Sequence, residues 1–135
     1  MVTIINSTFI NSKLTILRNN KTPHNKFRRT MNEISYLIAS EVLKYLSYSK
    51  IDVLTPLKKT SGTVIKQKIV IVPILRAGLG LVKGFAELLA EAEHGQIGLY
   101  RDEKTYKAVQ YLCKIPKIDN KLFIILDPML ATGHS

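Results

Sequence analysis

Two continuous apolar runs stand out in the pattern of hydrophobic and polar positions along the chain. Residues 69–75 and 122–126 contain no charged side chain and are rich in isoleucine, valine and leucine. Such runs are typical of strands that are buried on both faces of a parallel sheet. Pro73 interrupts the first run and predicts a strand end or a bulge there, because proline donates no hydrogen bond to a sheet.

Helical spacing of apolar residues follows Pro23 and returns after Gly80. The first segment, for which Asn25 is a plausible cap, predicts a helix with one apolar face, and the second predicts a helix that ends near Ala92. The apolar positions are Phe27, Met31, Ile34, Leu37, Ile38, Val42, Tyr45 and Leu46 in the first, and Leu81, Val82, Phe85, Leu88 and Leu89 in the second.

Shorter apolar segments predict further strands over 51–54, 63–65, 95–100 and 109–115. Turns are expected over 58–62 and 116–121, and a charged loop over 101–107. Strands that alternate with helices indicate an α/β fold with a parallel, Rossmann-like sheet. Ligands bind such sheets beyond the carboxyl ends of the strands, where the segments after residues 75 and 126 are predicted to lie.

Length and composition limit the alternatives. The chain has 135 residues, enough for one domain, and 46% hydrophobic with 22% charged residues excludes a disordered chain. No apolar run approaches the ~20 residues of a membrane helix, and no signal peptide is recognisable. The single cysteine, Cys113, rules out an internal disulfide and is expected to be a small buried hydrophobe. His24, His94 and His134 do not have zinc-site spacing, so no protein-held metal is expected.

The net charge of +10 is concentrated in the N-terminal half. Residues 1–68 hold 12 Lys or Arg against 3 Asp or Glu, whereas residues 69–135 hold 8 against 7. This excess can attract nucleic acid or another polyanion, or it can be a solvated lysine-rich surface. No sequence-specific nucleic-acid-binding module is recognisable, so nucleic acid is not the expected partner.

The segment after residue 126 carries candidate chemistry. An acid, Asp127, ends a buried strand, and Thr132, Gly133 and Ser135 follow it. The carboxylate can accept hydrogen bonds from sugar hydroxyls, and a glycine between two hydroxyl residues lets backbone amides surround a phosphate. The alternative is an ordinary strand-to-helix turn capped by Thr and Ser.

Three segments resemble the uracil phosphoribosyltransferase family. The sequence ILDPMLATGHS at 125–135 is similar to the family's ribose-5-phosphate loop. The sequence VPILRAGLG at 72–80 is similar to its pyrophosphate loop. The sequence IGLYRD at 97–102 is similar to a third segment of the family, whose arginine reaches the pyrophosphate. Pro128 stands where many other phosphoribosyltransferases carry a second acid, which favours the uracil branch. His134 departs from the glycine that is usual there.

The resemblance implies residue roles. Arg76 and Arg101 would clamp the diphosphate of 5-phosphoribosyl 1-diphosphate, and Asp127 would bind the ribose hydroxyls. Without the resemblance, either arginine could be a surface ion-pair partner, and Gly78 and Gly80 form no dinucleotide fingerprint. The other substrate-binding positions implied are Pro128, Met129, Leu130, Ala131, Thr132, Gly133, His134 and Ser135.

The implied reaction transfers the phosphoribosyl group to uracil, giving UMP and diphosphate, with Mg²⁺ carried by the substrate's diphosphate. The family is usually dimeric or larger, and some members bind a regulatory nucleotide such as GTP. We expect one incomplete phosphoribosyltransferase domain over 1–135, with a basic strand and helix region at 1–68 and a phosphoribosyl-diphosphate-binding half at 69–135. Since the family's uracil-reading segment has no counterpart here, weak activity is expected.

Two other functions stay open. Related folds serve as non-catalytic RNA-binding regulators, and the basic N-terminal half suits that role; RNA affinity that falls steeply with salt would support it. The chain could instead be a structural remnant, or a subunit completed by a second chain. The expected location is the cytoplasm, with a plastid or another organelle as the alternative, because the Ile-, Lys- and Asn-rich composition suggests an AT-rich genome.

Overall fold

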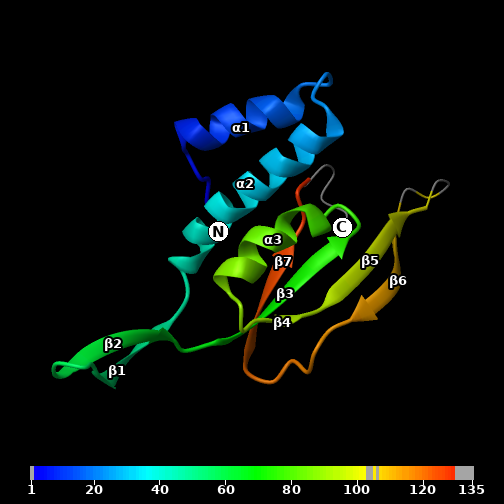
Figure 1. Cartoon of the computed structure of the whole chain (residues 1–135). Helices are drawn as coiled ribbons and strands as arrows, with labels where there is room; N and C mark the ends of the chain where they lie inside the picture. The colour runs from blue at the N-terminus through cyan, green and yellow to red at the C-terminus, as the bar shows by residue number, and fades with distance from the viewer. Residues whose placement is uncertain (1, 103–104, 106, 130–135) are drawn as a thin grey trace.

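The N-terminal half consists of two helices and a hairpin. The computed structural model describes residues 2–102, 105 and 107–129. Helix α1 spans Thr8–Arg18 and α2 spans His24–Leu43; β1 (Tyr48–Leu54) and β2 (Lys59–Ile65) then form an antiparallel hairpin that projects away from the rest of the molecule (Figure 1). Helix α1 was not predicted, and the turn expected at 58–62 is wrong in part, because β2 already begins at Lys59.

The second half is an α/β unit that contains both strands predicted from the apolar runs. The first is buried as expected, but the second is only partly buried, since Ile125 is 60% accessible and the strand pairs, within the described residues, on one edge only. Its elements are β3 (Lys68–Leu75), α3 (Leu79–Leu88), β4 (Glu93–His94), β5 (Gln96–Arg101), β6 (Ala108–Lys114) and β7 (Lys121–Leu126). Helix α3 is shorter than predicted and ends at its tenth residue. No helix within the described part of the chain is long and apolar enough to cross a membrane.

Strand β3 is the centre of a mixed sheet. Along one edge it pairs in parallel with β7 from residue 68 to residue 73. Along its other edge it pairs in parallel first with β4 at residues 70–71 and then with β5 at 74–75. Strand β6 lies outside β5 and is antiparallel to it, so the expected parallel sheet has an antiparallel margin. Because β3, β5 and β7 run in the same direction, their carboxyl ends lie at one edge of the sheet (Figure 1).

Helices α2 and α3 cover one face of this sheet. Ile69 and Ile71 of β3 are buried together with Leu81 and Phe85 of α3 and Ala39 of α2. Alternate residues of a strand face opposite sides, which explains why the odd-numbered residues of β3 contribute to this cluster. The burial of apolar area in this layer is the main stabilisation of the domain.

Pro73 does not end β3, contrary to the expectation. It is buried within the strand and pairs in register with Leu126 of β7. On the opposite edge, pairing with β4 ends at Ile71 and pairing with β5 begins at Ile74. Proline is tolerated there because its missing N–H falls in the gap between two partner strands.

Two local predictions are wrong for simple geometric reasons. Asn25 does not cap α2, because the helix starts one residue earlier and has Pro23 at the cap position. Cys113 is exposed rather than buried, because β6 is the outer strand at its side of the described sheet.

Candidate functional site

Arg76 follows directly from the carboxyl end of β3. It is exposed, and the Leu75–Arg76 peptide bond is cis. Two residues later Gly78 is the N-cap of α3, and no side chain caps the first turn of this helix. The N-terminus of α3, which is the positive end of the helix dipole, therefore lies at the same edge of the sheet as the backbone of Arg76.

Asp127 follows from the carboxyl end of β7, next to β3. Its side chain is exposed, and its Oδ1 atom accepts a hydrogen bond of 3.3 Å from the backbone N–H of Met129. Pro128 and Met129 are also exposed, and the Met129 side chain is 71% accessible. The carboxylate is thus held by its own turn and is exposed at the end of the strand.

The two strand ends touch through Gly78. A Cβ atom added to Gly78 would lie 2.3 Å from the carbonyl oxygen of Leu126 and 2.7 Å from the backbone N and O of Ile74. No side chain fits at that distance, so only glycine lets the segment after β3 approach the last residue of β7. The sequence interpretation missed this role, although a glycine that follows a buried strand is a known sign of close backbone approach.

Arg101 lies at the third strand end, on the opposite side of β3 from β7. It belongs to β5 rather than to the expected charged loop. The turn after it is closed by Asp102, whose Oδ1 atom accepts hydrogen bonds from the N–H of Thr105 at 2.6 Å and from its hydroxyl at 2.9 Å. The structure therefore brings the ends that carry Arg76, Arg101 and Asp127 to one edge, on three neighbouring strands.

The remaining predicted site residues lie outside the described residues. They are Leu130, Ala131, Thr132, Gly133, His134 and Ser135. The phosphate-binding role expected of this segment therefore stays a prediction.

Helix α3, and with it the Arg76 segment, is fixed by α2. The hydroxyl of Ser35, which is fully buried, donates a hydrogen bond to the carbonyl of Leu81 and accepts one of 3.0 Å from the N–H of Gly84. A Cβ atom on Gly84 would lie 2.4 Å from the backbone of Ser35 and Tyr36, so the two helix backbones are in direct contact. This contact was not predicted from the sequence.

Two exposed tyrosines stand near the end of β5. The rings of Tyr100 and Tyr111 contact each other, with centroids 6.3 Å apart. Each is also about half accessible, at 52% and 56%. Gly98 makes room for this pair, because a Cβ atom there would lie 2.5 Å from the Tyr111 ring.

Comparison with known proteins gives one consistent result. A family model described as uracil phosphoribosyltransferase matches residues 4–135. The uracil phosphoribosyltransferases of Finegoldia magna and Malacoplasma penetrans are 48% and 47% identical to the chain over 136 aligned residues. The alignments cover 99% and 100% of this chain but 65% and 66% of the relatives, so the chain spans slightly less than two thirds of the first relative's length.

A solved structure supports the same grouping. The AQ2163 protein from Aquifex aeolicus superimposes with a TM-score of 0.91 at 32% sequence identity, over 99% of this chain and 65% of that one. The agreement covers both the basic N-terminal half and the sheet. Taken with the family model and the sequence relatives, it shows that the chain belongs to the uracil phosphoribosyltransferase family.

Proposed function

We propose that the chain binds 5-phosphoribosyl 1-diphosphate at the carboxyl edge of β3, β5 and β7 and takes part in transferring its phosphoribosyl group to uracil. The observation that carries the proposal is the contact between Gly78 and the end of β7. Through it, the segment with a guanidinium group and the segment with a carboxylate become walls of one site. A ligand with a diphosphate at one end and a ribose at the other suits such a pair of walls.

The proposed roles follow from the chemistry of each group. Arg76 and Arg101 bind the diphosphate, because the guanidinium fork matches phosphate oxygens and keeps its charge at any physiological pH. Asp127 accepts hydrogen bonds from the ribose hydroxyls. The bond from the anomeric carbon to the diphosphate oxygen breaks while the bond from that carbon to uracil N1 forms, and the N1 proton is released. Charge that develops on the departing diphosphate is stabilised by the two arginines.

Magnesium enters this proposal as part of the substrate. The described residues contain no group of three or more His, Cys, Asp or Glu side chains that could hold a metal ion. Mg²⁺ often binds through one carboxylate together with substrate phosphates, and the exposed Asp127 fits that arrangement. When bound, the ion neutralises charge on the leaving diphosphate.

Calorimetric titration of the full chain with Mg²⁺ and 5-phosphoribosyl 1-diphosphate tests the binding step. We expect binding by the unmodified chain and at least tenfold weaker binding by Arg76→Ala and by Asp127→Asn, since each removes a charged hydrogen-bonding group. Lys50→Ala, on the distant hairpin, is the control for loss of positive charge. Equal binding by all four proteins would refute the site.

Formation of UMP from uracil is measured separately with the same variants. Activity that is lost in Arg76→Ala and retained in Lys50→Ala supports the transfer reaction. Binding of 5-phosphoribosyl 1-diphosphate without any UMP would limit the function of this chain to binding. The RNA-binding and regulatory alternatives, the regulatory nucleotide and the location in the cell stay untested predictions.

A further inference from the structure

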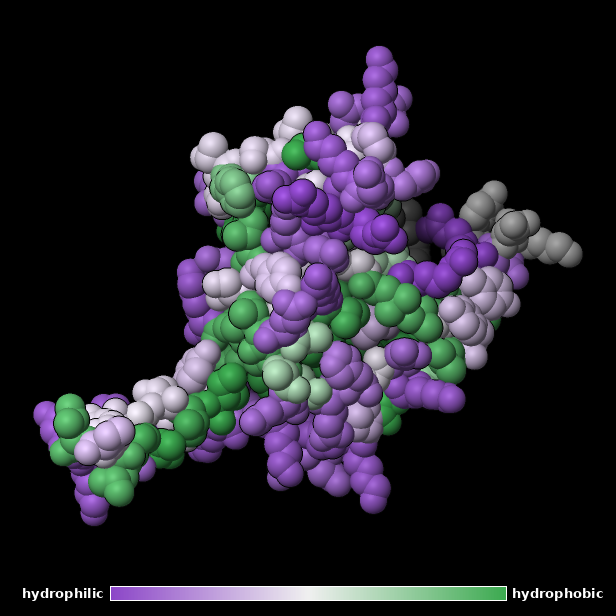
Figure 2. Space-filling view, in the orientation of Figure 1, coloured by the Kyte–Doolittle hydropathy of each residue, from purple (hydrophilic) through white to green (hydrophobic). Residues whose placement is uncertain are grey.

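Ser35 is a polar residue in the buried part of α2. Hydrophilic side chains gather on the visible surface over α1 and α2 (Figure 2), whereas Ser35 is 0% accessible. Alanine favours a helix more than serine does, and burial of a hydroxyl costs free energy unless the group is hydrogen-bonded. General stability therefore does not explain a serine at this position, and its hydrogen bonds are what distinguish it from alanine.

The Ser35 hydroxyl makes two hydrogen bonds to the backbone of α3. It donates to the carbonyl of Leu81 and accepts from the N–H of Gly84 at 3.0 Å. A serine within a helix commonly bonds to the carbonyl one turn earlier in its own helix, so bonds to a neighbouring helix are a specific arrangement. Hydrogen bonds are directional and apolar packing is not. These two bonds therefore fix both the rotation of α3 about its axis and its position along α2.

Leu81 belongs to the turn that connects α3 to the proposed site. Its N–H donates to the carbonyl of Gly78 at 3.0 Å, and the N–H of Gly78 donates to the carbonyl of Ile74 at 2.8 Å. The N–H of Leu79 donates to the carbonyl of Arg76 at 3.2 Å. A continuous series of backbone hydrogen bonds therefore runs from the end of β3, through the Arg76 segment, to the residue that the Ser35 hydroxyl holds.

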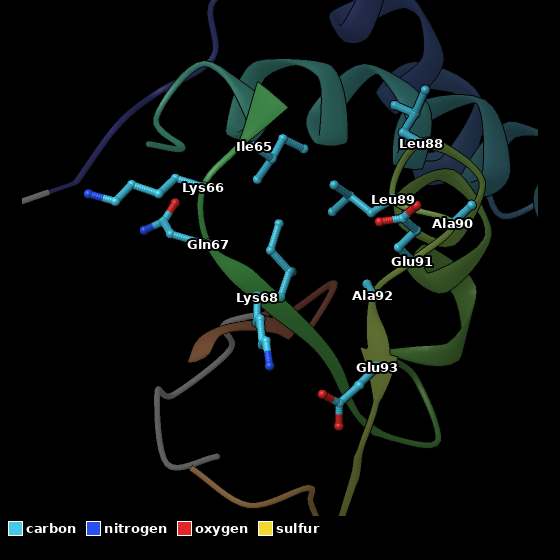
Figure 3. A pocket seen from close by; sticks show the side chains of 11 residues that line it. Ile65, Lys66, Gln67, Lys68, Leu88, Leu89, Ala90, Glu91, Ala92 and Glu93 are labelled. Atoms are coloured by element: carbon cyan, nitrogen blue, oxygen red, sulfur yellow. The ribbon is translucent and has the colours of Figure 1, made fainter. Parts of the chain in front are cut away.

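The last turn of α3 is held less closely. Leu88 is 45% accessible, and together with Leu89 it lines a hollow of about 560 Å³ at this end of the helix (Figure 3). Tyr36 of α2 donates a hydrogen bond to the Glu87 carboxylate there, but Glu87 is an exposed side chain. A long, exposed side chain fixes a helix less strictly than a buried bond to its backbone, because it retains rotamer freedom. The bonds of Ser35 are thus the firm attachment nearest to the proposed site.

We propose that Ser35 is a positioning residue for the diphosphate end of 5-phosphoribosyl 1-diphosphate, an inference that rests on the proposed function. Its hydroxyl sets where α3 begins and therefore where Arg76 lies relative to Asp127. The effect is one-sided, because the series of backbone hydrogen bonds leads to Arg76. Asp127 follows from β7 and is held by the N–H of Met129 in its own turn.

Ser35→Ala is the variant that tests this role. It removes both hydrogen bonds, while the Leu81 carbonyl and the Gly84 N–H keep the partners that a regular α-helix supplies within α3, so the chain is expected to fold. The matched control is Ala39→Gly, one turn further along α2 and equally buried at 0% accessibility. This control removes a buried methyl group and lowers helix propensity, so it destabilises the fold without removing a hydrogen bond to α3.

Calorimetric titration of the folded full chain with three probes in the presence of Mg²⁺ gives a readout that a merely structural role would not move. We expect Ser35→Ala to bind 5-phosphoribosyl 1-diphosphate and inorganic diphosphate about tenfold more weakly than the unmodified chain, because a small displacement of a binding group removes much of its contribution. Ribose 5-phosphate, which lacks the diphosphate, binds with unchanged affinity. Ala39→Gly binds all three probes as the unmodified chain does.

Three results would overturn the role of Ser35 and leave the proposed function standing. They are equal binding of diphosphate by Ser35→Ala and the unmodified chain, an equal loss of affinity for ribose 5-phosphate, and the same loss of diphosphate binding in Ala39→Gly. In each of them the unmodified chain still binds 5-phosphoribosyl 1-diphosphate. An unmodified chain that does not bind this ligand refutes the proposed function, and the role of Ser35 with it.

Discussion

Replacing Gly84 by alanine tests the contact between α2 and α3 most severely. The added methyl group would lie 2.4 Å from the carbonyl carbon of Ser35 and from the backbone nitrogen of Tyr36. It would also lie 2.5 Å from the Ser35 hydroxyl oxygen. Real Cβ atoms do not approach other heavy atoms closer than 3.0 Å, and two of these neighbours are backbone atoms, so the helices must move apart.

The expected cost follows from three contributions. Overpacking of a well-packed interior costs about 1–3 kcal/mol. Separation of the helices also weakens the two buried hydrogen bonds of Ser35, each of which contributes about 1 kcal/mol. Alanine recovers about 1 kcal/mol because it favours the helix more than glycine does. The net loss is about 2–4 kcal/mol, a large part of the total stability of a small domain.

Urea unfolding followed by circular dichroism measures this loss. Gly80→Ala is the matched control in the same helix, because its added methyl group would meet only the flexible Met31 side chain, at 3.0 Å from Cγ. We expect Gly80→Ala to change the free energy of unfolding by less than about 1 kcal/mol. If Gly84→Ala is as stable as Gly80→Ala, the close helix contact described above does not exist.

Three further predictions concern single residues. Gly78→Ala pushes the segment after β3 away from the carbonyl of Leu126, so we expect calorimetry to show lost binding of 5-phosphoribosyl 1-diphosphate; unchanged affinity would contradict it. The hydrogen bond from Lys13 lowers the pKa of Glu33. The Lys13–Glu33 interaction therefore stabilises the folded chain above the ordinary glutamate pKa, and this stabilisation is lost as the pH falls through the lowered pKa of Glu33. Acid titration of unfolding should therefore destabilise the unmodified chain more than Glu33→Gln, and parallel curves would refute this. Cys113 is exposed and should react with a thiol reagent without denaturant, whereas protection in the folded chain would show that it is buried.

The central strands and the site edge are the parts that sequence patterns predict well. The run at 69–75 forms β3, which has partner strands on both edges and contains residues 69–73 buried, so its composition indicates its central position. The run at 122–126 forms β7, which is only partly buried and pairs, within the described residues, with β3 alone. Arg76 and Asp127 follow these strands directly, and parallel pairing then places them at one edge. Since the order of strands β3 and β7 depends on long-range pairing, only the structure shows that the two ends are adjacent.

The periphery was predicted less well, for physical reasons. Helix α1 has a single buried residue, Ile10, so its sequence lacks the continuous apolar stripe that a core helix shows. Strand β2 is exposed over most of its length, and its Lys, Thr, Ser and Gly residues are typical of a turn. Its strand conformation is due to pairing with β1, and the local composition of β2 does not indicate this pairing. The contact between Ser35 and Gly84 likewise joins residues that are far apart in the sequence.

The central claim is that the ends of β3 and β7 form one ligand site, and amide chemical shifts measured during titration with 5-phosphoribosyl 1-diphosphate and Mg²⁺ test it most directly. The account predicts that backbone signals of Arg76, Gly78, Asp127 and Met129 shift together and saturate with one dissociation constant. Signals of the β1–β2 hairpin at 48–65 should stay unchanged. Shifts confined to helices α1 and α2, with none at the ends of β3 and β7, would contradict the account.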